Sequence, residues 1–258
     1  MKTFIREKPF VDVILPNYNK AKFLEEAVYS VINQTYKNWH LFVIDDFSTD
    51  SSSEIIDKLP ISKNITIIKL NKNRGPSFCR NYAMRMSKSK YISFIDSDDS
   101  WEKNKLERQI DFMERNNFDF TYTDYTSFVE KNGEKKNRKK TSLKDFFNYD
   151  TFIRNSSINT TTMIISRSIL GTCRFRKIQL CEDYLFKCEL LKKDNVAKKL
   201  NENLASYRIT NDSRSSKKLK NIYWLWYINK YYNKLKFINN IISIFFISIN
   251  SIRKYGIK

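Results

Sequence analysis

The chain has 258 residues, of which 41% are hydrophobic and 15% aromatic, enough for a real core, so wholesale disorder is excluded. The formal net charge is +19, and residues 217–258 hold nine Lys or Arg but no Asp or Glu. Such asymmetry points to an anionic surface as partner, either membrane lipid or nucleic acid.

The single His40 and four cysteines without paired spacing exclude the usual zinc sites and favour reduced thiols in the cytoplasm. Residues 1–9 are short and mixed in charge, unlike a signal peptide. The run 237–249 is interrupted by two Asn and is too short to span a membrane. We therefore expect a cytoplasmic protein that is soluble or lies at a membrane surface.

Apolar strands alternate with amphipathic helices over residues 10–116, which predicts right-handed βαβ units and a mostly parallel sheet. Polar residues follow each strand, and loops after parallel strands lie on one edge, so we expect the four clusters to converge. The predicted strands are 10–15, 41–44, 65–70 and 91–95; the helices are 20–34, 51–59, 77–86 and 103–115; the polar loops are 16–19, 45–50, 71–75 and 96–100.

The alternation weakens beyond residue 117. Strands are predicted at 118–125, 160–165 and 203–209, and a helix at 182–191. Residues 131–140 contain six basic residues against Glu134, and we interpret them as a solvated hairpin tip. Residues 217–258 predict two amphipathic helices rich in Tyr, Trp, Phe and Lys.

Three carboxylates, those of Asp96, Asp98 and Asp99, follow the strand at 91–95. Burying these carboxylates without a partner would cost free energy, so we expect them at the edge of the sheet. Their hard oxygen atoms are suitable ligands for Mg²⁺ or Mn²⁺ that carries a diphosphate. The alternative is an acidic turn in which Asp99 and Ser100 cap the next helix.

Other motifs narrow the chemistry. No G-x-G-x-x-G, P-loop or G-x-S-x-G sequence is present, and His40 at a strand start is interpreted as structural. The turn before the helix at 77–86 could hold diphosphate oxygens through helix amides and Arg80. Asp45 or Asp46 could accept from a base N–H, and Glu182 with Asp183 is the best acidic pair for a general base. The alternatives are that Arg80 is a surface charge and Asp183 a helix cap.

Five motifs, in order, resemble the inverting family-2 glycosyltransferases with the GT-A nucleotide-sugar fold. The resemblance is strong over residues 10–116 and thinner to about residue 215. The matching stretches are Val11-Asp12-Val13-Ile14-Leu15-Pro16-Asn17-Tyr18-Asn19, Ile44-Asp45-Asp46-Phe47-Ser48-Thr49-Asp50, Asn73-x-Gly75-x-x-x-x-Arg80-Asn81, Ile95-Asp96-Ser97-Asp98-Asp99-x-Trp101 followed by Lys105-Leu106, and Glu182-Asp183.

The resemblance implies a role for each matching residue. Pro16 and Tyr18 would line the uridine pocket, one of Asp45 and Asp46 would read the uracil, and Asn73 and Arg80 would contact the nucleotide. Asp96 and Asp98 match the D-x-D motif, with Asp98 binding Mn²⁺ or Mg²⁺ and Asp96 binding metal or ribose. Asp183 matches the catalytic base and Glu182 a neighbour that orients the acceptor. Tyr207-Arg208 with Ser213 and Ser215 resembles a late loop that closes on the donor diphosphate.

The resemblance implies a GT-A catalytic domain over 1–216, with a nucleotide-sugar-binding half at 1–116 and an acceptor-binding half at 117–216, followed by the tail 217–258. It also implies metal-dependent, inverting transfer of a hexose or N-acetylhexosamine from a UDP-sugar to a glycan or lipid-linked glycan in bacterial surface-polysaccharide synthesis, such as lipopolysaccharide, capsule or teichuronic acid. The chain departs from the family at Phe47, where Gly is common, at Ser100, and at Leu185-Phe186, where a Trp is usual.

The tail leaves two interpretations of its partner. Basic and aromatic residues interleave over 223–237, as in platforms that stack nucleic-acid bases, so a nucleic-acid-binding protein is the alternative function. That interpretation gives the acid-rich loops no role. We favour an anionic membrane surface at the inner face of the cytoplasmic membrane, with the tail as a cover for the catalytic domain as the competing view.

Overall fold

The computed structural model describes residues 10–60, 62–131, 134–141, 143–210 and 218–255. The described strands form one 10-stranded sheet in the order β3-β2-β1-β4-β9-β6-β10-β5, with β7 paired to β6 and β8 to β10. The strands are β1 (Val11–Asn17), β2 (Trp39–Asp45), β3 (Ile65–Lys69), β4 (Tyr91–Phe94), β5 (Ser100–Trp101), β6 (Phe120–Lys131), β7 (Glu134–Thr141), β8 (Phe146–Phe147), β9 (Ile164–Ser166) and β10 (Ala197–Arg208).

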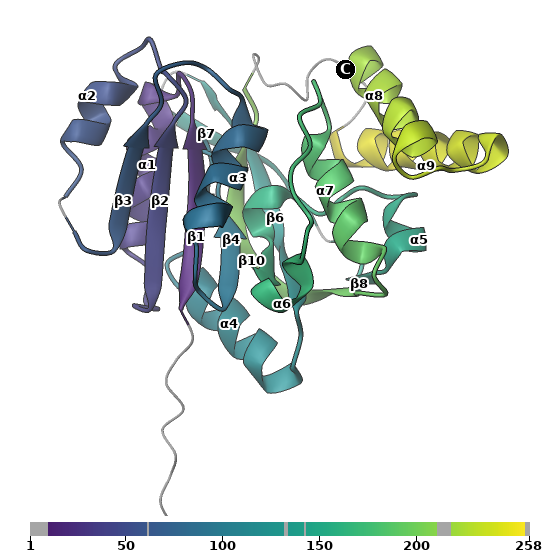
Figure 1. Cartoon of the computed structure of the whole chain (residues 1–258), viewed down its shortest axis with the longest axis horizontal. Coiled ribbons are helices and arrows are strands. Elements are labelled where there is room, and N and C mark those ends of the chain that lie inside the picture. Colours follow the sequence, from purple (N-terminus) through teal and green to yellow (C-terminus); the bar gives the residue numbers. More distant parts are fainter. Residues whose placement is uncertain (1–9, 61, 132–133, 142, 211–217, 256–258) are drawn as a thin grey trace, which may run out of the picture.

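Helices cover both faces of this sheet (Figure 1). The α-helices are α1 (Ala21–Ile32), α2 (Ser52–Asp57), α3 (Pro76–Met86), α4 (Lys105–Asn116), α5 (Tyr149–Phe152), α6 (Arg167–Leu170), α7 (Glu182–Leu191), α8 (Lys218–Tyr231) and α9 (Phe237–Tyr255), and η1 (Thr160–Thr162) is a 3-10 turn.

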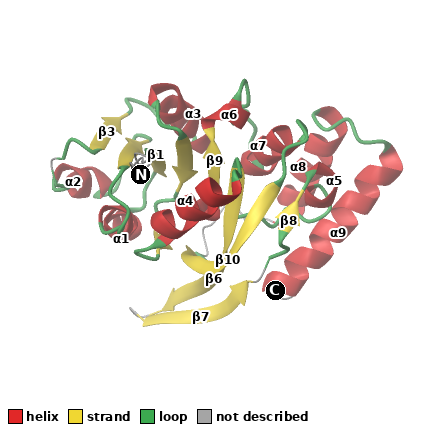
Figure 2. Ribbon diagram, turned by 90° about the horizontal axis from the view of Figure 1, so that it is seen from below, coloured by secondary structure: helices red, strands yellow, loops and turns green. Residues whose placement is uncertain are grey.

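The first four strands pair in parallel, which confirms the predicted βαβ half. Figure 2 shows α3 on one face of these strands and α1 and α4 on the other. Every residue of β1 is buried, because helices cover both faces of the sheet (Figure 2), and most of these residues are apolar. The register pairs Asn17 with Asp45, so the carboxyl ends of β1 and β2 meet at one edge.

The second half of the chain continues the same sheet. β9 pairs antiparallel with both β4 and β6, and β6 and β10 are parallel neighbours. The predicted hairpin is present, but the prediction that 131–140 is its solvated loop is wrong, since residues 134–140 belong to β7, which pairs antiparallel with β6. A charged sequence can form an edge strand because its backbone supplies the pairing while charges at 134–136 stay in solvent. The strand predicted at 160–165 is η1 followed by β9.

The two predicted C-terminal helices are present as α8 and α9, beside α7 and far from α2 (Figure 1). Leu225, Ile228 and Ile247 are buried and belong to the same hydrophobic core as the sheet. The interpretation of the tail as a cover for the rest of the molecule therefore holds for these inward side chains.

Candidate active site

The loops that follow β1 and β2 are tied together by one carboxylate. Asn17 Nδ2 donates to Asp45 Oδ1 over 2.8 Å, Ser48 Oγ donates to the same oxygen over 2.6 Å, and Ser48 N donates to Oδ2 over 3.1 Å. Asp45 is buried and acts as the acceptor at the centre of this junction. Pro16 is buried in β1 beside it, and Tyr18 is 46% exposed at the end of the same strand.

Asp46 binds the loop after β3 in the same way. Its two carboxylate oxygens accept from Arg74 N and Gly75 N, each over 2.7 Å, and Asn73 Nδ2 donates to Asp46 O over 3.2 Å. Gly75 has a φ of 84°, a conformation that glycine adopts without strain, and Pro76 begins α3 directly after it. The expected convergence of the first three polar loops is therefore confirmed. Asp45 and Asp46 both accept hydrogen bonds from loop residues, so this geometry is the same for the two candidates for contact with the uracil.

Arg80 is the residue at which the two halves of the chain meet. Its side chain is buried, with Nη2 donating to Asp96 Oδ1 over 2.6 Å and Nη1 lying 3.6 Å from Glu182 Oε1. Burial opposes its charge, but Asp96 and Glu182 raise the pKa of Arg80, so it stays a cation. Among the described residues, Nε and Nη1 of Arg80 have no hydrogen-bond acceptor. Both atoms are buried, so Arg80 would favour an anionic ligand such as a diphosphate through its charge, next to the partly exposed Asp96.

The D-x-D turn carries Asp98 close to a cation from the first loop. Lys20 Nζ donates to Asp98 Oδ2 over 2.7 Å, and burial raises the pKa of Asp98 in spite of that ammonium group. Asp96, by contrast, is paired with Arg80. The fourth polar loop thus joins the other three at the sheet edge.

The expectation that Asp99 and Ser100 cap a helix is wrong. Asp99 is buried, and it accepts from Thr161 Oγ1 over 2.5 Å and from Arg208 N over 3.0 Å. Ser100 lies in β5, and α4 begins later with Asn104 at its N-cap. A sequence rule for caps cannot foresee this, because the partners of Asp99 are 62 and 109 residues away.

Asp183 opens α7 next to Glu182 and is held by a lysine one turn further along. Lys187 Nζ donates to Asp183 Oδ2 over 2.8 Å and to Ile158 O over 2.8 Å, and Thr160 Oγ1 lies 3.4 Å from the same Oδ2. Burial would raise the pKa of Asp183, but the charge and hydrogen bond of Lys187, aided by Arg80, lower it to about 2. The lowered pKa keeps the carboxylate ionised at neutral pH, and its side chain is 42% exposed and therefore accessible. The helix N-cap is Cys181, which leaves Asp183 free of the capping role.

Arg208 ends β10, but its guanidinium is buried and bonded to Glu26 and Glu130. Ser213 and Ser215, the other members of the predicted late loop, lie outside the described residues. In this arrangement, the Arg208 guanidinium is therefore not available for the predicted contact with the donor diphosphate.

The described part of the chain contains no group of three or more His, Cys, Asp and Glu side chains arranged to hold a metal ion. A Mg²⁺ or Mn²⁺ ion that arrives with a diphosphate needs only one or two carboxylates from the protein. Asp98 and Asp96 supply such hard oxygens next to the unused donors of Arg80, so the residues fit a divalent ion bound together with a nucleotide.

Sequence reasoning missed the lysines and outer carboxylates of the site, namely Lys20, Lys187, Glu26 and Glu130. Lys187 carries a visible signal, because it stands four residues after Asp183 on a predicted helix. Lys20, Glu26 and Glu130 carry none, since their partners lie far away in the sequence.

The model of the family described as "Glycosyl transferase family 2" matches residues 12–184. The putative teichuronic acid biosynthesis glycosyltransferase TuaG of Bacillus subtilis (strain 168) is 34% identical over 238 residues, which cover 90% of this chain and 91% of TuaG. The Escherichia coli protein WfgD, a UDP-Glc:alpha-D-GlcNAc-diphosphoundecaprenol beta-1,3-glucosyltransferase, is 31% identical over 217 residues, covering 84% of this chain and 83% of WfgD.

Solved structures show the same fold. A crystal structure of Staphylococcus aureus TarS 1-349 superposes with a TM-score of 0.68 at 20% identity and covers 96% of this chain and 74% of that one. The mannosyltransferase PcManGT from Pyrobaculum calidifontis, in complex with GDP-Man and Mn²⁺, gives a TM-score of 0.68 at 13% identity and covers 97% and 77%. At these identities the likeness establishes the fold alone, and it confirms the predicted GT-A architecture.

Proposed function

Because this chain belongs to glycosyl transferase family 2, we propose that it transfers a hexose or N-acetylhexosamine from a UDP-sugar to a glycan or lipid-linked glycan acceptor. The proposed pathway class is synthesis of a bacterial cell-surface polysaccharide, as the names of TuaG and WfgD suggest. The observation that carries the proposal is Arg80, a buried cation with unused donors between the carboxylates of Asp96 and Glu182.

The donor would lie along the edge formed by the four polar loops. Pro16 and Tyr18 would contact the uridine, Asp45 or Asp46 would accept from the uracil N–H, and Asn73 would approach the nucleotide from the β3–α3 loop. Arg80 would favour the diphosphate through its positive charge behind Asp96, near the first turn of α3, since its Nε and Nη1 atoms are themselves buried.

Asp98, with Asp96 beside it, would hold Mn²⁺ or Mg²⁺ next to that diphosphate. A bound divalent ion would neutralise negative charge on the departing UDP. Lys20 Nζ contacts Asp98 Oδ2, so a divalent ion bound at that oxygen would compete with the ammonium group of Lys20.

Asp183 would act as the general base of a single displacement. Its carboxylate would take the proton of an acceptor hydroxyl while that oxygen forms a bond to the anomeric carbon. The bond between the anomeric carbon and the UDP oxygen breaks at the same time, and UDP leaves with the electron pair. Attack from the face opposite UDP gives inversion, and Glu182 would orient the acceptor from its place beside Arg80.

A screen of UDP-sugars for Mn²⁺-dependent hydrolysis and transfer tests this function, with UDP-Glc and a GlcNAc-diphospholipid acceptor first because WfgD uses them. We expect turnover that EDTA abolishes and that Asp183→Asn lowers by about a hundredfold or more. Asp194→Asn is the control, because Asp194 is an exposed residue just after the same helix. Metal-independent turnover, or full transfer by Asp183→Asn, would contradict the proposed mechanism.

The tail supports a further part of the proposal, peripheral binding to the inner face of the cytoplasmic membrane. The inward side of α9 combines the buried Ile247 with two hydrogen-bonded polar residues: Asn240 Nδ2 donates to Trp226 O over 3.1 Å and Ser243 Oγ to Ile153 O over 2.5 Å. The outward side is mostly apolar, and its exposed large hydrophobic residues are Phe237, Ile238, Ile241, Phe245, Phe246 and Ile252. We call Ile238, Ile241, Phe245 and Ile252, which recur at helical spacing, the outer stripe of α9.

An apolar stripe flanked by Lys234, Lys236 and Arg253 fits an interface of anionic lipid. Among the described helices, none is long and apolar enough to cross a membrane. A lipid-linked acceptor would make such surface binding useful, since enzyme and acceptor then share two dimensions. No nucleic-acid partner is proposed, because the acid-rich loops have a use in the glycosyltransferase site.

A further inference from the structure

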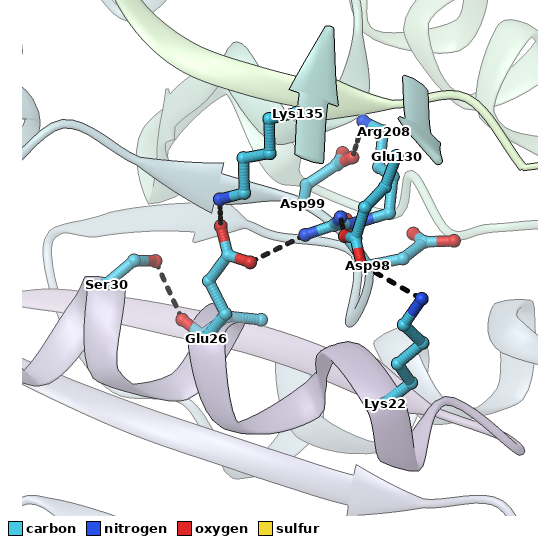
Figure 3. Close-up of polar contacts among 9 residues, drawn as sticks. Lys22, Glu26, Ser30, Asp98, Asp99, Glu130, Lys135 and Arg208 are labelled. Atoms are coloured by element: carbon cyan, nitrogen blue, oxygen red, sulfur yellow. Dashed lines mark hydrogen bonds and ion pairs between the residues drawn. The ribbon is translucent and has the colours of Figure 1, made fainter. Parts of the chain in front are cut away.

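Arg208 bonds to the D-x-D turn through both its backbone and its side chain (Figure 3). Its N–H donates to Asp99 Oδ1 over 3.0 Å, and its Nε donates to Asp98 O over 3.0 Å. The residue at the end of β10 therefore touches two consecutive residues of the turn, 109 and 110 positions earlier in the chain.

The remaining nitrogens of Arg208 are bonded to carboxylates from two other elements. Nη2 donates to Glu26 Oε2 of α1 over 2.6 Å, and Nη1 donates to Glu130 of β6. The rings of Phe23 and Phe128 lie 4.2 Å and 4.6 Å from the guanidinium carbon. The side chain is 1% exposed, so no nitrogen of this guanidinium is left to face a ligand.

Two lysines complete the cluster by sharing the same carboxylates. Lys22 Nζ lies 2.9 Å from Glu130 Oε1, and Lys135 Nζ of β7 lies 2.5 Å from Glu26 Oε1 (Figure 3). Glu26 and Glu130 are thus each balanced by Arg208 on one side and by a lysine on the other. A buried cation that is bonded at every nitrogen is fixed in place, because moving it would leave charges uncompensated.

We infer that Arg208 is a positioning residue, which holds the Asp98–Asp99 turn in the shape that allows Asp98 to take a divalent ion, and that Glu26 and Glu130 orient it. This inference rests on the proposed function. It replaces the expectation that Arg208 reaches the donor diphosphate. Three carboxylates within four residues repel one another, and a fixed cation behind the turn counters that repulsion without occupying the face of Asp98 that meets the donor.

The test compares Glu26→Gln and Arg208→Lys with Glu25→Gln, an exposed glutamate on the same helix that serves as the matched control. Mn²⁺ binding is measured by electron paramagnetic resonance in the presence of UDP, alongside thermal unfolding and the kinetics of UDP-sugar hydrolysis. We expect Glu26→Gln and Arg208→Lys to weaken Mn²⁺ binding by about tenfold and to lower kcat, with KM for the UDP-sugar changed by less than about threefold. Glu25→Gln should match the wild type.

Each other outcome has a distinct meaning. Wild-type Mn²⁺ affinity in both variants, combined with a rise of about tenfold or more in donor KM for Arg208→Lys, would make Arg208 a donor contact and overturn the inference. Glu26→Gln retains all of the basic residues, so it decides the question even where Arg208→Lys fails to fold. Failure of the wild type to hydrolyse any UDP-sugar would overturn the proposed function itself, whereas an active wild type with unchanged variants overturns the inference alone.

Discussion

At the scale of single residues, Lys187 decides how Asp183 can serve as a base. The ammonium group lowers the pKa of Asp183 to about 2, against the effect of burial. A carboxyl whose pKa is lower in the folded protein than in the unfolded chain stabilises the fold above the unfolded pKa. That stability is lost as the pH falls through the folded pKa. The same shift keeps Asp183, the proposed base, ionised at neutral pH.

Lys187→Met should therefore move the acid limb of the pH–rate profile to higher pH. Without Lys187, the burial of Asp183 is less well opposed, so more of it is protonated in mild acid. We expect the ratio of kcat/KM at pH 5 to that at pH 8 to fall by about tenfold. The measurement is UDP-sugar hydrolysis from pH 4.5 to 8.5, with exposed Lys177→Met as control. An unchanged profile with reduced overall rate would mean that Lys187 only supports packing.

Lys105 is a second buried lysine, and it bears on stability. Its side chain has no exposed surface, Nζ donates to Gln109 Oε1 over 3.0 Å, and burial lowers its pKa to about 7. Between this value and the unfolded pKa of 10.5, the unfolded chain binds more protons than the folded one. Stability contributed by this group consequently rises with pH across that window.

Lys105→Met should abolish that rise. We expect the free energy of unfolding of the wild type to gain roughly 1–4 kcal/mol between pH 7 and pH 9.5 relative to Lys105→Met. Urea denaturation at the two pH values measures it, and Lys103→Met, an exposed neighbour, should behave as the wild type. Parallel pH dependence in Lys105→Met and the wild type would show that Lys105 keeps its charge at neutral pH in the folded state.

At the scale of elements, the periodicity of apolar residues made the βαβ units predictable, whereas the high charge of β7 prevented its prediction as a strand. β1 to β4 are apolar runs separated by amphipathic helices, so local sequence determines their type. β7 reads as a loop because its residues are basic, and only its backbone pairing with β6 makes it a strand. The residues of the candidate site divide in the same way. Asp96, Asp98 and Asp183 lie at the ends of elements that local sequence predicts. The partners of Arg208 and Asp99 are brought to them only by tertiary packing.

The outer stripe of α9 gives a prediction for that helix alone. Wild-type protein should float with vesicles that contain anionic lipid, and Ile238→Ser combined with Phe245→Ser should lower the bound fraction by about tenfold or more, because less apolar area enters the interface. Met86→Ser, an exposed apolar position on α3, is the control and should float as the wild type does. Flotation of the double variant at wild-type levels would contradict the assignment. Loss of a dimer in sedimentation would show instead that the stripe covers a second copy of the chain.

At the scale of the whole molecule, one sheet joins the two predicted halves of the catalytic domain. β9 pairs with β4 of the first half and with β6 of the second, and Arg80 bridges Asp96 to Glu182 across the same junction. Neither link could be predicted from the sequence, because each depends on the tertiary packing of elements from different parts of the chain. The proposed donor-binding and acceptor-binding halves consequently share one continuous sheet.

The tail is bonded to the rest of the molecule in the same way, so its removal should affect stability. Tyr184 OH of α7 donates to Asn229 Oδ1 of α8 over 2.8 Å, and Leu225, Ile228 and Ile247 contribute to the common core. A chain ending at residue 216 would expose the surfaces against which these side chains pack. We expect its Tm to fall by about 5 °C or more, or the protein to aggregate.

The double variant at Ile238 and Phe245 should keep its Tm within about 2 °C of the wild type, since both side chains are more than half exposed. Thermal unfolding of the truncated chain, the double variant and the wild type measures this difference. A loss of lipid binding after truncation could therefore result from unfolding, whereas a loss after substitution of the outer stripe could not. An unchanged Tm after truncation would instead make α8 and α9 an independent appendage, with the core of the remaining protein complete without Leu225 and Ile228.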